Sequence, residues 1–219
     1  MTQMDDLAKP LILIGAGGHA KVVLALAVAA GRKVVGVCDP LLAREGASVW
    51  NGISVLGDDS ALNQIDSSAM ELINGIGQLV GSPLRKTVFQ RFFGAGYHFA
   101  TLIHPTAWVA PDVKLAEGVQ VMAGAVIQPD AQVGENSVIN TKASIDHDCV
   151  IGAHVHIAPG ATLCGNVQLD QGVFVGAGAV LIQGLHVGRD AVVGAGVTLT
   201  RNLECDRTLL GAPNRLKAR

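Results

Sequence analysis

One short segment of the chain places a histidine between two carboxylates, in the order Asp146, His147 and Asp148. A carboxylate beside an imidazole raises its basicity and can fix its tautomer, as a general base working near neutral pH requires. The sequence leaves open which of the two aspartates touches the ring. It also leaves open a plainer role, in which the three residues are a solvated polar stretch of a repeating fold.

A second segment with possible chemistry is the glycine turn GAGGHA at residues 15–20, which contains Gly17, Gly18 and His19. Turns of the GxGxxA type present backbone N–H groups and a helix N-terminus to an anion, and Asp39 stands where an acid can bind a ribose hydroxyl. A dinucleotide such as NAD, a nucleotide diphosphate and a purely structural turn all remain possible. A domain of about 98 residues without a second mononucleotide-binding half is short for a whole NAD.

Short apolar runs alternate with helical patterns in the first part of the chain. Strands are expected at residues 11–14, 34–37, 71–77 and 99–102, and helices at residues 21–30 and 82–93. This alternation predicts a small doubly wound α/β domain, Rossmann-like in its first βαβ unit, over residues 1–98.

The rest of the chain is a six-residue repeat. From Ile103 to Leu199 every sixth residue, seventeen in all, is Ile, Leu or Val, and the residue four positions later is small or apolar. Gly, Asn and Asp crowd the fourth position of the hexad, because these residues tolerate positive φ at tight turns. An aliphatic residue every six fits a coil with three short sides. The repeat therefore predicts a parallel β-helix over residues 99–205, followed by a tail at residues 206–219.

Three hexads complete one coil, so residues eighteen apart lie one above the other. Gly165 is one coil beyond His147 and is expected to leave an open space beside the imidazole for a slender ligand. His156 lies half a coil away on a different face, so two neighbouring subunits could bring it to His147 more easily than one chain could. Flat faces rich in glycine and alanine stack well on copies of themselves, which predicts a closed trimer.

Three further residues are expected to have structural rather than chemical roles. His154 and His186 are expected at the surface. Cys149 falls at the small, inward position of its hexad, so we expect it in the core rather than as a nucleophile.

The composition excludes several classes of function. Sixteen basic against eighteen acidic residues give a net charge of −2, which offers no basic face for a nucleic acid. Mean hydropathy is high at +0.40, but the longest apolar run, residues 22–31, is well short of the ~18–20 residues that span a membrane. Four cysteines without a CxxC pair, and a start MTQMDD unlike a signal peptide, favour a reduced, cytoplasmic protein without a metal.

Four segments together resemble a known family: LILIGAGGHAKVV, LIHPTAWVAPDVKLAEGV, VINTKASIDHDCVIGAHVHIAPGATLCGNV and the closing GAPNR. They are similar to bacterial sugar acetyltransferases of the sialic-acid O-acetyltransferase type, whose members N-acetylate nucleotide-linked 4-amino-sugars in bacillosamine and perosamine synthesis. The resemblance covers nearly the whole chain. It implies a left-handed β-helix, a homotrimer, acetyl-CoA lying between adjacent prisms, and an N-terminal domain that holds the nucleotide.

The resemblance also implies roles for single residues. His147 matches the family's catalytic base, and Asp148 matches the carboxylate beside it, where several relatives have Glu. His156 matches a histidine that approaches the thioester. The other matching positions are the acceptor-binding Gly17, Gly18, His19, Asp39, Gly77 and Asn140, and the CoA-binding Gly165, Ala177 and Ala195.

One position departs from the family pattern. The UDP-using bacillosamine enzyme has a second acid after the position of Asp39, whereas this chain has Pro40, so guanosine becomes a rival to uridine. The expected activity is acetyl transfer from acetyl-CoA to the C4 amine of a UDP- or GDP-linked amino-dideoxy sugar for surface glycan biosynthesis. O-acetylation of a sialic-acid-like sugar, and a non-catalytic trimeric scaffold that senses a nucleotide, are the alternatives.

Overall fold

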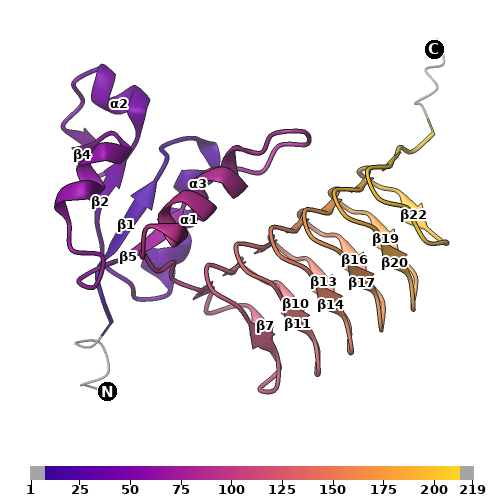
Figure 1. The fold of residues 1–219 in the computed structure, drawn as a ribbon. Coiled ribbons are helices and arrows are strands. Elements are labelled where there is room, and N and C mark those ends of the chain that lie inside the picture. Colours follow the sequence, from indigo (N-terminus) through magenta and orange to yellow (C-terminus); the bar gives the residue numbers. More distant parts are fainter. Residues whose placement is uncertain (1–7, 213–219) are drawn as a thin grey trace, which may run out of the picture.

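The computed structural model describes residues 8–212 as an α/β domain followed by a long stack of short parallel strands (Figure 1). The MTQMDD start and residues 213–219 of the expected tail, with the end of the GAPNR motif, lie outside the described residues. No helix within residues 8–212 is long and apolar enough to cross a membrane.

The N-terminal domain is built on a five-stranded sheet in the order β3-β4-β2-β1-β5. Its strands are β1 (Leu11–Ile14), β2 (Val34–Cys38), β3 (Val49–Trp50), β4 (Ile53–Gly57) and β5 (Glu71–Asn74), and only the β3–β4 pair is antiparallel. The helical segments are α1 (Gly18–Ala29), α2 (Pro40–Arg44), the 3-10 helix η1 (Asp59–Gln64) and α3 (Leu84–Gly94). Central β1 is buried throughout, as a continuous apolar run in a parallel sheet should be.

The alternation of side chains along β1 explains how the helices cover both faces of this sheet. Leu11 and Leu13 pack with the apolar residues of α1, whereas Ile12 and Ile14 pack with those of α3. Two buried side chains of the β-helix, Met122 and Val138, join the α1 side of this core. The N-terminal domain is thereby fixed against the first coils of the β-helix.

The segment at residues 99–102 was expected to be the last strand of this sheet, and that prediction is wrong. Phe99 makes only an isolated bridge to Leu72, and the next strand, β6 (Leu102–Ile103), pairs with the β-helix. The reason is that the segment crosses between the two domains: the Phe99 N–H donates to the Glu117 side chain at 2.6 Å. The β3–β4 hairpin and η1 were not anticipated.

The β-helix has three faces, each a parallel sheet of two-residue strands. Face 1 contains β7 (Trp108–Val109), β10 (Val126–Ile127), β13 (Ser144–Ile145), β16 (Thr162–Leu163), β19 (Val180–Leu181) and β22 (Thr198–Leu199). Face 2 contains β8 (Lys114–Leu115), β11 (Gln132–Val133), β14 (Val150–Ile151), β17 (Gln168–Leu169) and β20 (His186–Val187). Face 3 contains β6, β9 (Gln120–Val121), β12 (Val138–Ile139), β15 (His156–Ile157), β18 (Phe174–Val175), β21 (Val192–Val193) and β23 (Thr208–Leu209).

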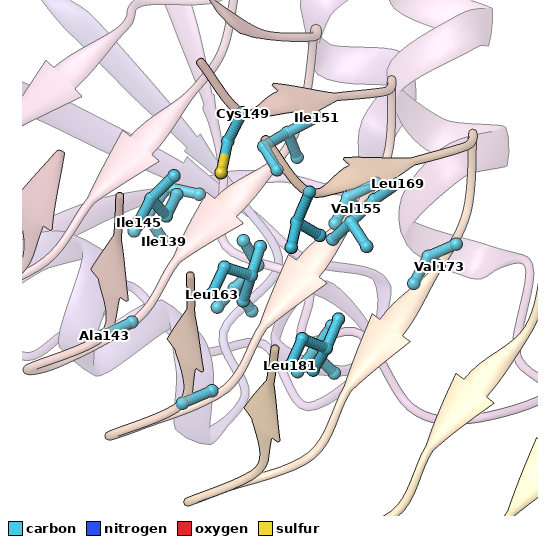
Figure 2. Close-up of a cluster of buried hydrophobic side chains, with 14 of the residues drawn as sticks. Ile139, Ala143, Ile145, Cys149, Ile151, Val155, Leu163, Leu169, Val173 and Leu181 are labelled. Carbon is cyan, nitrogen blue, oxygen red and sulfur yellow. The ribbon is translucent and has the colours of Figure 1, made fainter. Parts of the chain in front are cut away.

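The three faces enclose a prism, and the aliphatic residues of the six-residue repeat fill its interior. Each strand from β6 to β22 ends on one of its aliphatic residues, and these side chains stack in columns through the prism together with the small residues of the corners (Figure 2). Fully burying one such side chain contributes about 1.5–3 kcal/mol. Cys149 is wholly buried among them, as expected.

The turns between faces use the left-handed backbone region at the fourth hexad position. Asp148 and His154 both occupy it, with φ of 60° and 57°, and neighbouring coils have Gly, Asn or Asp there. After β22 the regular spacing ends, since Leu203 makes only a bridge to Val187. Thr208–Leu209, inside the segment expected as a tail, then forms β23 and pairs with β21.

Candidate active site

The histidine and its two aspartates lie on the edge between face 1 and face 2, in the turn from β13 to β14. The left-handed backbone at Asp148 turns its carboxylate back, so that Oδ2 lies 2.6 Å from Nδ1 of His147. Asp146 instead accepts the backbone N–H of His147 through Oδ1 at 2.8 Å. The structure therefore pairs the imidazole with Asp148.

This pairing prepares the ring to accept a proton. The hydrogen bond to Asp148, followed by the charge of Asp146, raises the pKa of His147 above its usual value. With Nδ1–H donated to a carboxylate, the neutral ring carries its lone pair on Nε2. His147 is also well exposed, at 60% of its side-chain surface, so Nε2 is accessible to a substrate.

The expected open space beside the imidazole at Gly165 is absent, because the ring itself fills it. A Cβ built on Gly165 would lie 2.7 Å from both Cε1 and Nε2 of His147, closer than real Cβ contacts. The missing side chain thus lets the ring rest against the backbone of the next coil. The Cys149 thiol nearby has its pKa raised to about 11, mainly by burial, and donates to the Cys164 carbonyl at 3.3 Å.

His156 lies on face 3, where it is buried beside the N-terminal domain. Its ring stacks on Phe174 with centroids 4.9 Å apart and planes 4° from parallel. Burial, and then the positive charge of Arg85, lower the pKa of His156 to about 3, so the ring is neutral. Its Nδ1 is buried without a hydrogen-bond partner among residues 8–212.

The glycine turn of the N-terminal domain has an open outer side. A Cβ built on Gly17 or Gly18 would meet nothing within 4 Å, and Gly17 begins α1 without a side-chain cap, so the first N–H groups of the helix are free to bind an anion. His19 points the other way and is half-buried, with Nε2 3.1 Å from Oε1 of Gln120 on β9. Gly77 passes close to His19, since a Cβ built on Gly77 would lie 3.3 Å from the Cβ of His19.

Asp39 fastens this turn to the end of β2. Its Oδ2 accepts the Ala16 N–H at 2.8 Å, and its Oδ1 accepts the N–H groups of Leu41 and Leu42 at 2.8 and 3.1 Å, which caps α2. Pro40 is the first residue of that helix. The carboxylate therefore holds the glycine turn against the start of α2.

The remaining expected residues mark a different edge of the prism. Three of them lie in turns from face 3 to face 1, namely Asn140, Ala177 and Ala195. The turn with Ala177 is two coils beyond that with Asn140, and the turn with Ala195 is one coil further. Asn140 is half-buried and accepts the Thr141 N–H at 2.8 Å, whereas both alanines are exposed. Face 1 separates this edge from His147. Apart from Gly165, which the His147 ring contacts, one chain thus does not bring the His147–Asp148 pair together with the other expected site residues.

Of the two histidines expected at the surface, one was placed wrongly from the sequence. His186 is at the surface as expected, with Nε2 3.0 Å from Asp170. His154, also expected at the surface, is buried: its Nδ1 lies 3.0 Å from Nδ2 of Asn136, and its ring meets Phe89 edge-on. The domain interface covers it, and an interface between distant segments leaves no mark in the hexad pattern.

Two surface grooves lie near the residues described above. A groove of about 430 Å³ lies between the loop before α3 and the outer coils, with Gln78, Lys86 and Phe174 in its walls. A second, of about 350 Å³, lies on face 2 beside Asp148 and Gln132. Neither holds both the His147 base and the glycine turn. Within residues 8–212 no cluster of three or more His, Cys, Asp or Glu could hold a metal ion.

Comparison with known families assigns both halves of the chain. The model of the PglD N-terminal domain matches residues 10–92. The bacterial transferase hexapeptide model (six repeats) matches residues 130–165, and the hexapeptide repeat of succinyl-transferase matches residues 171–201. No curated protein sequence matches.

Solved structures match along nearly the whole chain. A histidine-to-alanine variant of GDP-perosamine N-acetyl transferase from Caulobacter crescentus, in complex with CoA and GDP-perosamine, is 35% identical, with 96% of this chain and 97% of that chain covered and a TM-score of 0.84. The acetyltransferase domain of PglB from Neisseria gonorrhoeae FA1090 is 32% identical, with 93% and 97% covered and a TM-score of 0.85. WeeI from Acinetobacter baumannii AYE shares the fold at 22% identity, with 95% and 99% covered and a TM-score of 0.81. These matches confirm the expected fold class, a Rossmann-like α/β domain followed by a left-handed parallel β-helix.

Proposed function

The chain belongs to the hexapeptide-repeat sugar N-acetyltransferases with a PglD-type N-terminal domain, and on that premise we propose that it acetylates the C4 amine of a nucleotide-linked amino-dideoxy sugar. Acetyl-CoA is the acetyl donor. The observation that carries the proposal is the exposed His147–Asp148 pair, since the lone pair on Nε2 of this pair can act as a general base.

The reaction needs no covalent enzyme intermediate. The amine nitrogen attacks the thioester carbonyl, and the new C–N bond forms while Nε2 of His147 takes the amine proton. Asp148 stabilises the resulting imidazolium through Nδ1–H. When the C–S bond breaks, the imidazolium returns the proton to the departing CoA thiolate. Cys149 takes no part, because it is buried and its raised pKa keeps it protonated.

The N-terminal domain supplies the acceptor site in this proposal. The free N–H groups at Gly17 and Gly18 bind the diphosphate, and the end of β2 at Asp39 and Pro40 lies where the nucleoside would extend. Because Pro40 leaves no second carboxylate after Asp39, we take guanosine as the base. The GDP-perosamine in the Caulobacter crescentus relative supports this choice.

The site is completed by a second copy of the chain. His147 lies on the edge between faces 1 and 2, whereas the acceptor domain covers face 3, so the base of one copy must serve the acceptor bound by its neighbour. A homotrimer closes this arrangement symmetrically. Acetyl-CoA would lie between the prisms, along the edge with Ala177 and Ala195, where small side chains let pantetheine approach the backbone. Neutral His156 on face 3 then supplies a donor to the thioester oxygen.

The experiment that tests the proposal is release of CoA thiol from acetyl-CoA in the presence of GDP-, UDP- or dTDP-linked 4-amino-4,6-dideoxy sugars. We expect turnover with the GDP-linked sugar and acetylated product by mass spectrometry. Turnover with the UDP-linked sugar alone would contradict the choice of base. No CoA release with any of the three sugars would contradict the enzymatic proposal and favour a nucleotide-sensing scaffold.

A further inference from the structure

A set of buried polar side chains, with half-buried His19 at one end, joins the N-terminal domain to face 3. It runs from His19 through Gln120 and Asn74 to Arg85 and Asn136, and every step is a hydrogen bond. The mechanism above uses none of these side chains. A buried polar network holds one arrangement when its donors and acceptors are matched, so the proton positions can be worked out along it.

Arg85 fixes the first of these positions. The residue is 2% exposed, and its guanidinium forms no ion pair among the described residues but donates to backbone carbonyls. Nη1 donates to the carbonyls of Asn74 and Ile76 at 2.9 and 2.8 Å, and Nε and Nη2 approach the carbonyl of Asn136 at 3.4 Å. Arg85 thereby holds the Asn74 carbonyl in place between the two domains.

The Asn74 carbonyl in turn fixes the amide of Gln120. This side chain is 1% exposed, and its Nε2 donates to the Asn74 carbonyl at 2.9 Å. A flipped amide would bring two oxygen acceptors to that separation, which is repulsive. The amide oxygen of Gln120 must therefore face His19.

An oxygen acceptor at 3.1 Å requires that Nε2 of His19 carry the proton. Burial, and then the charge of Arg85, lower the pKa of His19 to about 4, so the ring is neutral at neutral pH and has no second proton. Its lone pair is then on Nδ1, which has no hydrogen-bond partner within residues 8–212. The charged or titratable groups facing this ring are Arg85 and His156.

We propose that Gln120 is a positioning residue that holds His19 as the Nε2–H tautomer, so that Nδ1 accepts a hydrogen bond from a hydroxyl or amine of the acceptor sugar. The nature of the ligand rests on the proposed function. A ring lone pair repels phosphate oxygens, so His19 faces the sugar, and the diphosphate is bound by the N–H groups at Gly17 and Gly18.

The test is nitrogen NMR of the full-length protein labelled with nitrogen-15 in its histidines, with the His19 signals assigned by their loss in His19→Gln. In the wild type we expect a protonated Nε2 and an unprotonated Nδ1 from pH 5 to 8. Gln120→Met has nearly the same size but neither hydrogen bond, and we expect it to give a mixture of tautomers. Gln168→Met is the matched control, because Gln168 has the same hexad position on face 2 but is exposed. A protonated Nδ1 in the wild type, or an unchanged tautomer in Gln120→Met, would overturn the proposal.

The ligand contact is tested with the nucleotide amino-sugar added to the same samples. Binding should shift Nδ1 of His19 in the direction of an accepted hydrogen bond, and Gln120→Met should raise KM for the sugar about tenfold while KM for acetyl-CoA stays unchanged. An Nδ1 signal that does not move when the sugar binds would overturn the contact. If the sugar binds and moves Nδ1 but is never acetylated, the proposed function fails while this inference stands.

Discussion

The most informative perturbation of the base is a single methyl group at Gly165. A Cβ there would lie 2.7 Å from Cε1 and Nε2 of His147, and ordinary contacts begin at 3.4 Å, so the ring must move by about 0.7 Å or rotate away. Either movement disturbs the 2.6 Å hydrogen bond to Asp148 or the direction of Nε2. Misplacing a reacting group by about 1 Å can cost about 10²-fold in rate. We therefore expect Gly165→Ala to lower kcat by about 10- to 10²-fold.

The fold should tolerate this change. The imidazole is largely exposed and can rotate into solvent, so we expect the free energy of unfolding to stay within about 0.5 kcal/mol of the wild type. The assay is steady-state CoA release at saturating acetyl-CoA and amino-sugar, with thermal unfolding in parallel. Gly94→Ala is the control, since a Cβ at the end of α3 meets nothing within 4 Å. Full kcat in a folded Gly165→Ala protein would refute the placement of the catalytic ring.

The other predictions concern charge, burial and pH. Asp148→Asn removes the main cause of the raised pKa of His147, so the acidic limb of the pH profile of kcat/KM should move to lower pH and the plateau should fall about tenfold or more. An acidic limb that does not move would show that a group other than His147 titrates there. Burial lowers the pKa of His154 to about 4 and of His156 to about 3, so the unfolded chain binds more protons than the folded one below the usual value of 6.5. Stability present above pH 6.5 should then fall progressively toward pH 4, and a Tm that is flat across this range would contradict the burial of these rings. Cys149→Ala should keep kcat within about twofold of the wild type, because the thiol is in the core; loss of turnover in a folded variant would implicate it in the chemistry.

The β-helix was predictable because its period is local and strict. An aliphatic residue at every sixth position and a small one four later specify an interior, so the inward position of Cys149 could be read from spacing alone. The first βαβ unit was predictable for a similar reason, since the apolar run of β1 is followed directly by the glycine turn and α1.

The parts that could not be predicted depend on backbone direction or on distant contacts. Asp146 and Asp148 are equivalent in a linear sequence, and only the left-handed turn at Asp148 decides which carboxylate reaches the ring. The burial of His154 and the network through Arg85 arise where α3 covers the β-helix. Such an interface combines residues more than fifty positions apart, so no local pattern signals it.

The central claim is that His147 is the base for acetyl transfer, and comparison of His147→Ala with His186→Ala tests it most directly. Both variants remove an exposed histidine that contacts an aspartate on the same prism, but His186 lies on face 2, two coils beyond β14, the strand that follows His147. With the amino-sugar that the wild type accepts, kcat/KM should fall about 10²- to 10⁴-fold in His147→Ala and remain unchanged in His186→Ala. Equal activity of the two variants would contradict the account.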